Sequence, residues 1–288
     1  RKVLEALAKS GAFDGVARAD GVHRGQVFAT IERAQELAAA TQRDRETGQK
    51  SLLALLDPGG DAGKRALRYA DTPEWSPKEV LAFERENLGF YVSGHPLDRY
   101  ADDLRRHSNA TTADLESRAP RSQVSIGGVV ADFREKLLKS GRRMAFFALD
   151  DGRGQVDAIC FPVVYERVEA ALKGDEPLLC TGTVQMEGEE GAVVTRLHLE
   201  DAVPLATVRQ QKTRLVELSL NADVVTREEL GRLAKLLGEH RGECPVSLRL
   251  QIPGQSETLL ALPQRVSPTD ALLLGLDRMF GAHVAVLR

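Results

Sequence analysis

The spacing of hydrophobic residues changes once along the chain and divides it into two regions. Up to residue 109, apolar side chains recur at intervals of three and four with almost no alternation, a pattern typical of helices. From Gln123 onward the interval becomes two in several short segments, which indicates β-strands. The pattern predicts a multidomain α+β protein with a helical N-terminal region.

The best-defined helix of the first region is predicted to begin at Ser76. The sequence Ser-Pro-Lys-Glu at 76–79 offers an N-cap, a proline at the first helical position and a glutamate that can bond back to the cap. Gly94 and Pro96 are expected to end this helix. Its predicted apolar face consists of Leu81, Phe83, Leu88 and Tyr91. The side chains expected to face water are Glu84, Arg85 and Glu86.

Residues 49–56 form an apolar island, because 41–48 are wholly polar and proline and glycine crowd 58–63. Its sharpest short motif is Gln49, Lys50, Ser51, Leu52 and Leu53. A glutamine before paired leucines can place its amide in a polar notch and the leucines in a partner's pocket, a small contact that needs avidity. On pattern alone the core reading is favoured, in which leucines attach a short helix to the protein. Those leucines would be Leu52, Leu53, Leu55 and Leu56.

The second region begins with five candidate strands and one helix. The strands are predicted at 123–132, 143–150, 155–161, 178–187 and 192–203. Asp151 and Gly152 turn the second strand into the third, and a helical stretch at 163–172 follows the third. This order matches a five-stranded oligonucleotide-binding (OB) barrel.

The last 80 residues predict a small βαββαβ domain, for which a split βαβ arrangement is expected. The strands are expected at 214–220, 245–252, 257–262 and 283–287. The helices are expected at 226–238 and 268–280, each with a capping sequence at its start.

Basic and aromatic residues of the barrel are candidates for binding single-stranded nucleic acid. The connection between the first two strands carries Arg134, Lys136, Lys139, Arg142 and Arg143. The following strands carry Phe146, Phe147 and Phe161, which could stack on bases. Alternation puts Phe146 and Phe147 on opposite faces, so at least one is expected in the core. Because residues 121–208 hold 10 basic and 14 acidic side chains, a net of -4, only a local and weak electrostatic footprint is expected.

The amino-acid composition indicates the class of protein to which the chain belongs. Of 288 residues, 42% are hydrophobic and 28% charged, with a net charge of -3, as in soluble globular proteins of two or three domains. The longest apolar run, 144–149, is far shorter than the ~20 residues of a membrane span. Three separated cysteines in apolar contexts indicate reduced thiols and a cytoplasmic protein. Because the chain starts at Arg1 with apolar residues already at helical spacing, we expect a piece of a longer chain.

The search for a catalytic or metal site finds little. Asp150 and Asp151 precede Gly152 at the predicted hairpin, so a solvated turn is expected there. The sequence has no CxxC and no helical pair of histidines, which argues against zinc. We predict no catalytic residue, metal ligand or cofactor in this stretch.

Three strings resemble one family, in the same order. They are Leu-Glu-Ala-Leu-Ala-Lys-Ser-Gly-Ala-Phe-Asp at 4–14, Glu-Arg-Glu-Asn-Leu-Gly-Phe-Tyr-Val-Ser-Gly-His-Pro-Leu at 84–97, and Arg-Val-Ser-Pro-Thr-Asp at 265–270. Together they are similar to the C-terminal region of the bacterial DNA polymerase III alpha subunit, the replicative family C DNA polymerase. The resemblance covers essentially the whole chain.

The resemblance implies four domains with separate partners. They are the end of a helix-hairpin-helix region that grips duplex DNA (1–40), a helical sliding-clamp-binding region (41–120), an OB domain that meets the single-stranded template (121–208), and a domain like the one that binds the clamp-loader tau subunit (209–288). The duplex DNA candidates are Lys9, Ser10, Gly11 and Ala12, whose amides would hold a phosphate. The clamp motif would be Gln49 to Leu53, although Leu53 stands where the family frequently has an aromatic residue.

The resemblance also implies what this stretch does not do. Family members polymerise DNA with carboxylates that hold two magnesium ions, in a palm domain that no segment here resembles. The stretch is therefore expected to be inactive alone and to tether a cytoplasmic, nucleoid-associated polymerase to clamp, DNA and clamp loader. Two alternatives stay open. One is a general single-strand or RNA-binding module resembling the anticodon-binding domain of some aminoacyl-tRNA synthetases, and the other is the translesion branch of the same polymerase family.

Overall fold

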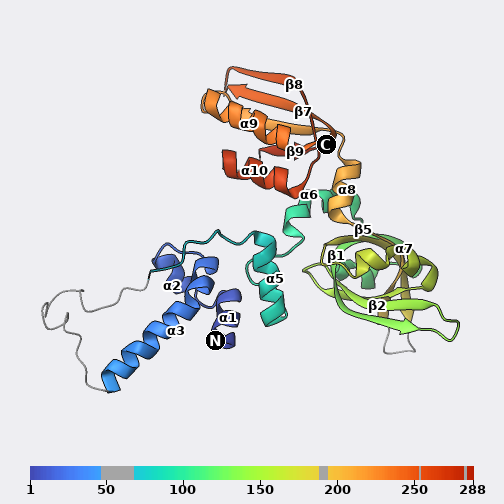
Figure 1. The fold of residues 1–288 in the computed structure, drawn as a ribbon. Helices are drawn as coiled ribbons and strands as arrows, with labels where there is room; N and C mark the ends of the chain where they lie inside the picture. The colour runs from blue at the N-terminus through green and yellow to red at the C-terminus, as the bar shows by residue number, and fades with distance from the viewer. Residues whose placement is uncertain (47–67, 188–193, 253, 282–283) are drawn as a thin grey trace, which may run out of the picture. The chain divides into compact units, whose positions relative to one another are not determined.

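A computed structural model describes residues 1–46, 68–187, 194–252, 254–281 and 284–288. The chain divides into two compact units, Arg1–Pro96 and Leu97–Arg288. Figure 1 shows the helices of the first unit and, in the second, the barrel and a smaller sheet. Among the described residues, no helix is both long and apolar enough to cross a membrane.

The first unit is helical, as its spacing predicts. Its main helices are α1 (Lys2–Lys9), α2 (Asp14–Ala19), α3 (Arg24–Glu46) and α5 (Pro77–Leu88). The predicted capping box of α5 is confirmed, because Ser76 Oγ accepts from the Glu79 amide while the Glu79 carboxylate accepts from the Ser76 amide. The predicted end is wrong. The helix stops at Leu88 because Gly89 takes the left-handed conformation (φ 83°), which glycine adopts without a Cβ penalty.

The closed five-stranded barrel is confirmed, with strand order β1-β2-β3-β5-β4. Its elements are β1 (Gln123–Leu137), β2 (Arg143–Asp150), β3 (Gln155–Cys160), α7 (Pro162–Leu172), β4 (Leu178–Glu187) and β5 (Val194–Pro204). Inward side chains of every strand and of α7 form one buried core, including Val124, Phe147 and Leu197. The core cysteines Cys160 and Cys180 have pKa values raised to about 12 by burial, so they are packing residues and not nucleophiles at neutral pH.

The sequence suggested that the turn between β2 and β3 is simply solvated, but the structure gives it a further contact. It holds a short segment that precedes the barrel, η3 (Thr112–Ser117). The Asp151 carboxylate accepts from the Thr112 amide at 2.8 Å and from its hydroxyl at 2.6 Å, and it also accepts from the amides of Arg153 and Gly154. Asp151 thus pins η3 to the end of the barrel.

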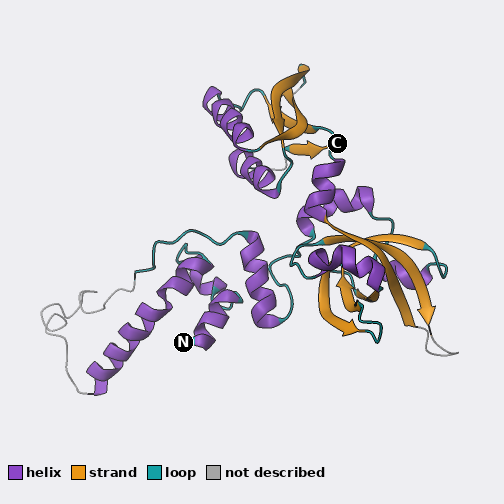
Figure 2. Cartoon of the chain, turned by 45° about the vertical axis from the view of Figure 1, so that its right-hand side comes forward, coloured by secondary structure: helices purple, strands orange, loops and turns teal. Residues whose placement is uncertain are grey.

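The tail of the second unit has the predicted βαββαβ order. Its elements are β6 (Val216–Asn221), α9 (Arg227–Glu239), β7 (Arg241–Ile252), β8 (Ser256–Val266), α10 (Asp270–Phe280) and β9 (Ala285–Leu287). Both helices lie on one face of the sheet (Figure 2). The split arrangement is wrong, because the strand order β8-β7-β6-β9 places the parallel strands β6 and β7 side by side. The tight β7–β8 hairpin sends β8 to the outer edge, so no strand separates the parallel pair.

An unpredicted helix, α8 (Leu205–Lys212), joins the barrel to the tail. Its Arg209 is 3% exposed and donates to Asp103 of α6 (Ala101–His107) at 2.7 Å and to Asp270 of α10 at 2.6 Å. The Arg209 guanidinium also lies 4.4 Å from the ring centroid of buried Tyr100, whose hydroxyl donates to Asp270. One buried cation therefore fastens three segments far apart in the sequence.

We expect the substitution Arg209→Ala to lower the free energy of unfolding of the second unit by about 3–5 kcal/mol, because it leaves the buried Asp103 carboxylate without its cation. Urea unfolding followed by circular dichroism measures this change. Lys212→Ala, on the exposed end of the same helix, is the control and should change the midpoint little. Equal shifts in the two variants would contradict the role given to Arg209.

Candidate nucleic-acid interface

The outer face of the barrel can be read from the alternation along β2. Ala145, Phe147 and Leu149 belong to the buried core, so Met144, Phe146 and Ala148 point the other way. Phe147 is 3% exposed, whereas Phe146 is only half-buried. The expectation that one of this phenylalanine pair is core is confirmed, and Phe146 is the one left for the outer face.

A β-bulge brings two basic residues of β1 to the same face as Phe146. The register between β1 and β2 shifts between Ala131 and Arg134, where Asp132 has a positive φ of 48°. Before the shift Val130 pairs with the core residue Leu149, and after it Arg134 pairs with Phe146 and Lys136 with Met144. Directly opposed residues share a face of a sheet. The extra residue therefore turns Arg134 and Lys136 outward, and both are exposed.

Arg143 points to the opposite side of the same hairpin. Its guanidinium bonds to Glu169 of α7 at 2.8 Å and to Glu135 at 3.1 Å. Glu135 in turn accepts from the hydroxyl of buried Tyr165 and pairs with Lys173 at 3.1 Å. The hydrogen bond from Tyr165, and next that from Lys173, lowers the pKa of Glu135. Arg143 thus clamps the hairpin onto α7, away from the face that Arg134 and Lys136 share.

The other predicted residues of this group lie at the ends of the face. Lys139 and Arg142 are exposed in the connection between β1 and β2, where the Leu138 amide donates to the Arg142 carbonyl at 2.9 Å. Phe161 is 43% exposed just after β3. The structure therefore gathers Arg134, Lys136 and Phe146 on one face, places Lys139 and Arg142 at the tip of its hairpin, and sets Arg143 apart.

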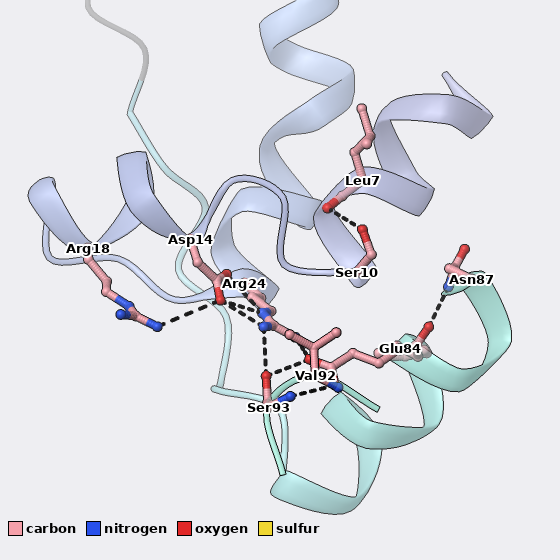
Figure 3. Close-up of polar contacts among 10 residues, drawn as sticks. Leu7, Ser10, Asp14, Arg18, Arg24, Glu84, Asn87, Val92 and Ser93 are labelled. Carbon is pink, nitrogen blue, oxygen red and sulfur yellow. Dashed lines mark hydrogen bonds and ion pairs between the residues drawn. The ribbon is translucent and has the colours of Figure 1, made fainter. Parts of the chain in front are cut away.

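The first unit is built around a second buried ionic cluster (Figure 3). The Arg24 guanidinium bonds to Asp14 at 2.7 Å and to Glu84 at 2.7 Å, and it also donates to the Ser93 hydroxyl. Glu84 is fully buried, so the expectation that it faces water is wrong. The Glu84 carboxylate also accepts from the amides of Val92 and Ser93. Through its bond to Arg24 of α3, it therefore connects the loop after α5 to α3.

The predicted duplex contacts lie at the end of α1, beside this cluster. The amides of Ser10, Gly11 and Ala12 donate to carbonyls of α1, and Lys9 pairs with Glu86 at 3.0 Å while lying over the Phe83 ring. Gly11 has a φ of 83°, and a Cβ there would fall 2.2 Å from the Arg24 guanidinium. The turn thus has a packing role of its own, and its contact with a phosphate stays a prediction.

The motif from Gln49 to Leu53 lies outside the described residues. Among those that are described, no three His, Cys, Asp or Glu side chains gather as a metal site.

Sequence reasoning missed the residues whose roles depend on distant partners. Glu84 was expected to face water and Arg209 was given no role, because nothing local shows the partners that they meet across about 60 and 106 residues. No binding role was predicted for His198, whose ring lies 5.1 Å from that of Phe161. The one available signal was alternation, since Leu197 and Leu199 are core residues on either side of it.

Comparisons with known proteins bear on the whole chain. An OB-fold nucleic acid binding domain family (tRNA_anti-codon) matches residues 124–225. The chain is similar to DNA polymerase III alpha subunits along nearly all its length. The subunit of Pseudomonas fluorescens is 28% identical over 98% of this chain and 25% of its own, and that of Mycobacterium tuberculosis is 32% identical over 98% and 23%.

The predicted resemblance to part of the DNA polymerase III alpha subunit is thereby confirmed, and it fits a partial C-terminal region. The chain spans about a quarter of the length of these relatives. Among solved structures, the mitochondrial single-stranded DNA binding protein Rim1 of S. cerevisiae covers 30% of this chain and 96% of its own, at 16% identity and a TM-score of 0.25.

We expect the first unit to lose stability in acid, because Glu84 then becomes protonated. Burial alone would raise the pKa of this carboxyl, but hydrogen bonds from Ser93, Arg24 and the Val92 amide outweigh burial and lower it to about 2. A carboxyl group whose pKa is lowered in the folded state stabilises the fold at pH values above its ordinary pKa. This contribution is lost as the pH falls toward 2. We expect Glu84→Gln to cost about 3 kcal/mol near pH 7 and to flatten the loss of stability in acid.

Urea unfolding at a series of pH values between about 7 and about 3 measures this effect. Glu86→Gln, an exposed carboxylate on the same helix, is the matched control and should keep the acid dependence of the original chain. A Glu84→Gln variant that loses stability in acid as steeply as the original would contradict the role given to this carboxylate.

Proposed function

We propose that this chain is a non-catalytic part of a DNA polymerase III alpha subunit, and that its barrel holds the single-stranded template. The observation that carries the proposal is the outer face on which Arg134 and Lys136 lie beside Phe146. Cations can follow the phosphates of a single strand while an aromatic ring stacks on its bases. Neither Arg134 nor Lys136 forms an ion pair with another described residue, so both charges are available to DNA.

The other contacts of the proposed function lie elsewhere on the chain. Gln49, Lys50, Ser51, Leu52 and Leu53 bind the sliding clamp, residues 1–40 contact duplex DNA, and residues 209–288 bind the clamp-loader tau subunit. Each contact is weak alone, but on one chain each raises the effective concentration of the others. The parent protein is then a cytoplasmic, nucleoid-associated DNA-directed DNA polymerase whose magnesium-dependent chemistry takes place in another domain.

The similarity over 98% of the chain favours this function over a general single-strand or RNA-binding module, which would explain only the barrel. The translesion branch of the same polymerase family is the remaining alternative. Because the tail resembles the domain that binds the clamp-loader tau subunit in the replicative branch, binding of this chain to that subunit separates the two.

Changing Arg134 and Lys136 together to alanine tests the DNA-binding face. Each cation that meets a phosphate contributes about 0.7 to the slope of log affinity against log salt concentration for single strands. We expect weaker binding to an oligothymidylate and a slope smaller by about 1.4. Fluorescence anisotropy across a salt series, with the 288-residue chain, measures both quantities.

The control removes two positive charges from α9 in the tail, as Arg227→Ala with Lys235→Ala, and should leave the slope unchanged. If the Arg134 and Lys136 variant binds with the original salt slope, the barrel face does not contact the strand.

The clamp contact is tested by changing Gln49, Leu52 and Leu53 to alanine. We expect loss of binding to the cognate sliding clamp, which should lie roughly in the micromolar range for so short a motif, with unchanged thermal stability. Isothermal titration calorimetry measures the binding. Leu55→Ala with Leu56→Ala is the matched control. Lower thermal stability in both variants, without loss of clamp binding, would show instead that these leucines attach a helix to the core.

A further inference from the structure

The outer face of the barrel continues past Phe146 onto β5. Leu197 and Leu199 of this strand are core residues, so His198 between them points outward. In the parallel pairing of β3 with β5, His198 lies opposite Ile159, and Ile159 in turn lies opposite Phe146 of β2. His198 therefore shares the outer face with Phe146.

These pairings define one row of side chains across four adjacent strands. The row runs from Arg134 through Phe146 and Ile159 to His198. With strands about 4.8 Å apart, its three steps cover about 14 Å. Ile159 is only 9% exposed, so the accessible members of the row are Arg134, Phe146 and His198. A cation followed by two rings offers a path across the strands for a chain of bases.

Phe161 stands beside the far end of this row on a fixed backbone. It is the N-cap residue of α7, with Pro162 at the first helical position, and its carbonyl accepts from the Tyr165 amide at 2.8 Å. Its ring meets the His198 ring edge to face, with centroids 5.1 Å apart and planes at 85°. The ring is nevertheless 43% exposed. An aromatic side chain fixed by its backbone and a neighbouring ring loses little entropy when a base stacks on it.

We propose that Phe161 and His198 form the distal end of the single-strand path, where Phe161 stacks on a base and His198 is the positioning residue that holds its ring. A strand that enters at Arg134 and Lys136 crosses Phe146 and leaves over β5. This inference rests on the proposed function of the barrel face and names the far end of the same site.

The competing explanation is that the two rings merely cover the aliphatic surface around Ile159. A leucine at position 161 distinguishes the two, because it keeps an apolar contact with His198 but has no aromatic face. We expect Phe161→Leu to weaken binding of an oligothymidylate of about 16 nucleotides by roughly 5-fold or more, and Phe161→Trp to retain or tighten it. If the leucine and tryptophan variants both bind like the original chain, Phe161 does not stack on a base.

The positioning role of His198 is tested by a double-mutant cycle. His198→Ala should weaken binding in the original chain but add little in the Phe161→Leu background, since only an aromatic ring needs orienting. Fully additive losses would overturn the positioning role. Urea midpoints of all variants show whether any of them has lost its fold.

The Arg134 and Lys136 variant separates this inference from the proposed function. If that variant binds more weakly while all changes at 161 and 198 are neutral, the face binds DNA but the strand does not reach β5. If none of these variants changes binding, the proposed function of the face fails as well. Weaker binding at both ends of the row is the expected result.

Discussion

The second unit depends on one buried cation. Arg209 reaches carboxylates on α6 and α10 and lies against Tyr100, so its charge is satisfied only when the helices before the barrel, the helix after it and the tail are all in place. A buried guanidinium without its partners costs several kcal/mol, which links the folding of these segments. The barrel and the tail are therefore expected to unfold as one cooperative body, although each has a hydrophobic core of its own.

The first unit is also held together by a buried arginine that pairs with carboxylates from other segments. Arg24 and Glu84 meet in the interior, and the carboxylate also fixes the loop that follows α5. Gly11 lies against the Arg24 guanidinium, so the turn after α1 and the ionic cluster restrain each other. In both units, a buried arginine connects helices that lie far apart in the sequence.

The sequence predicts the elements of this protein better than their long-range contacts. Period-two alternation finds all five barrel strands, and the Ser76 capping box finds the start of α5, because both signals lie within a few residues. The burial of Glu84 and Arg209 depends on partners far along the chain, and no local pattern contains that information. The same is true within the site. The bulge at Asp132, which turns Arg134 and Lys136 to the outer face, contains no glycine or proline by which the sequence could have indicated it.

For the single-strand contact proposed above, the division of charge between the two sides of the β1–β2 hairpin has a consequence for the rate of association. The barrel domain carries a net of -4, while the cations of its outer face act only at short range once salt screens them. Free DNA thus meets a domain that does not steer it inward, and encounters from solution are slow compared with those of a basic domain. A strand held nearby by other contacts escapes that limit. A domain that binds the template as proposed is therefore suited to retaining a strand already delivered to it, and less suited to capturing one from solution.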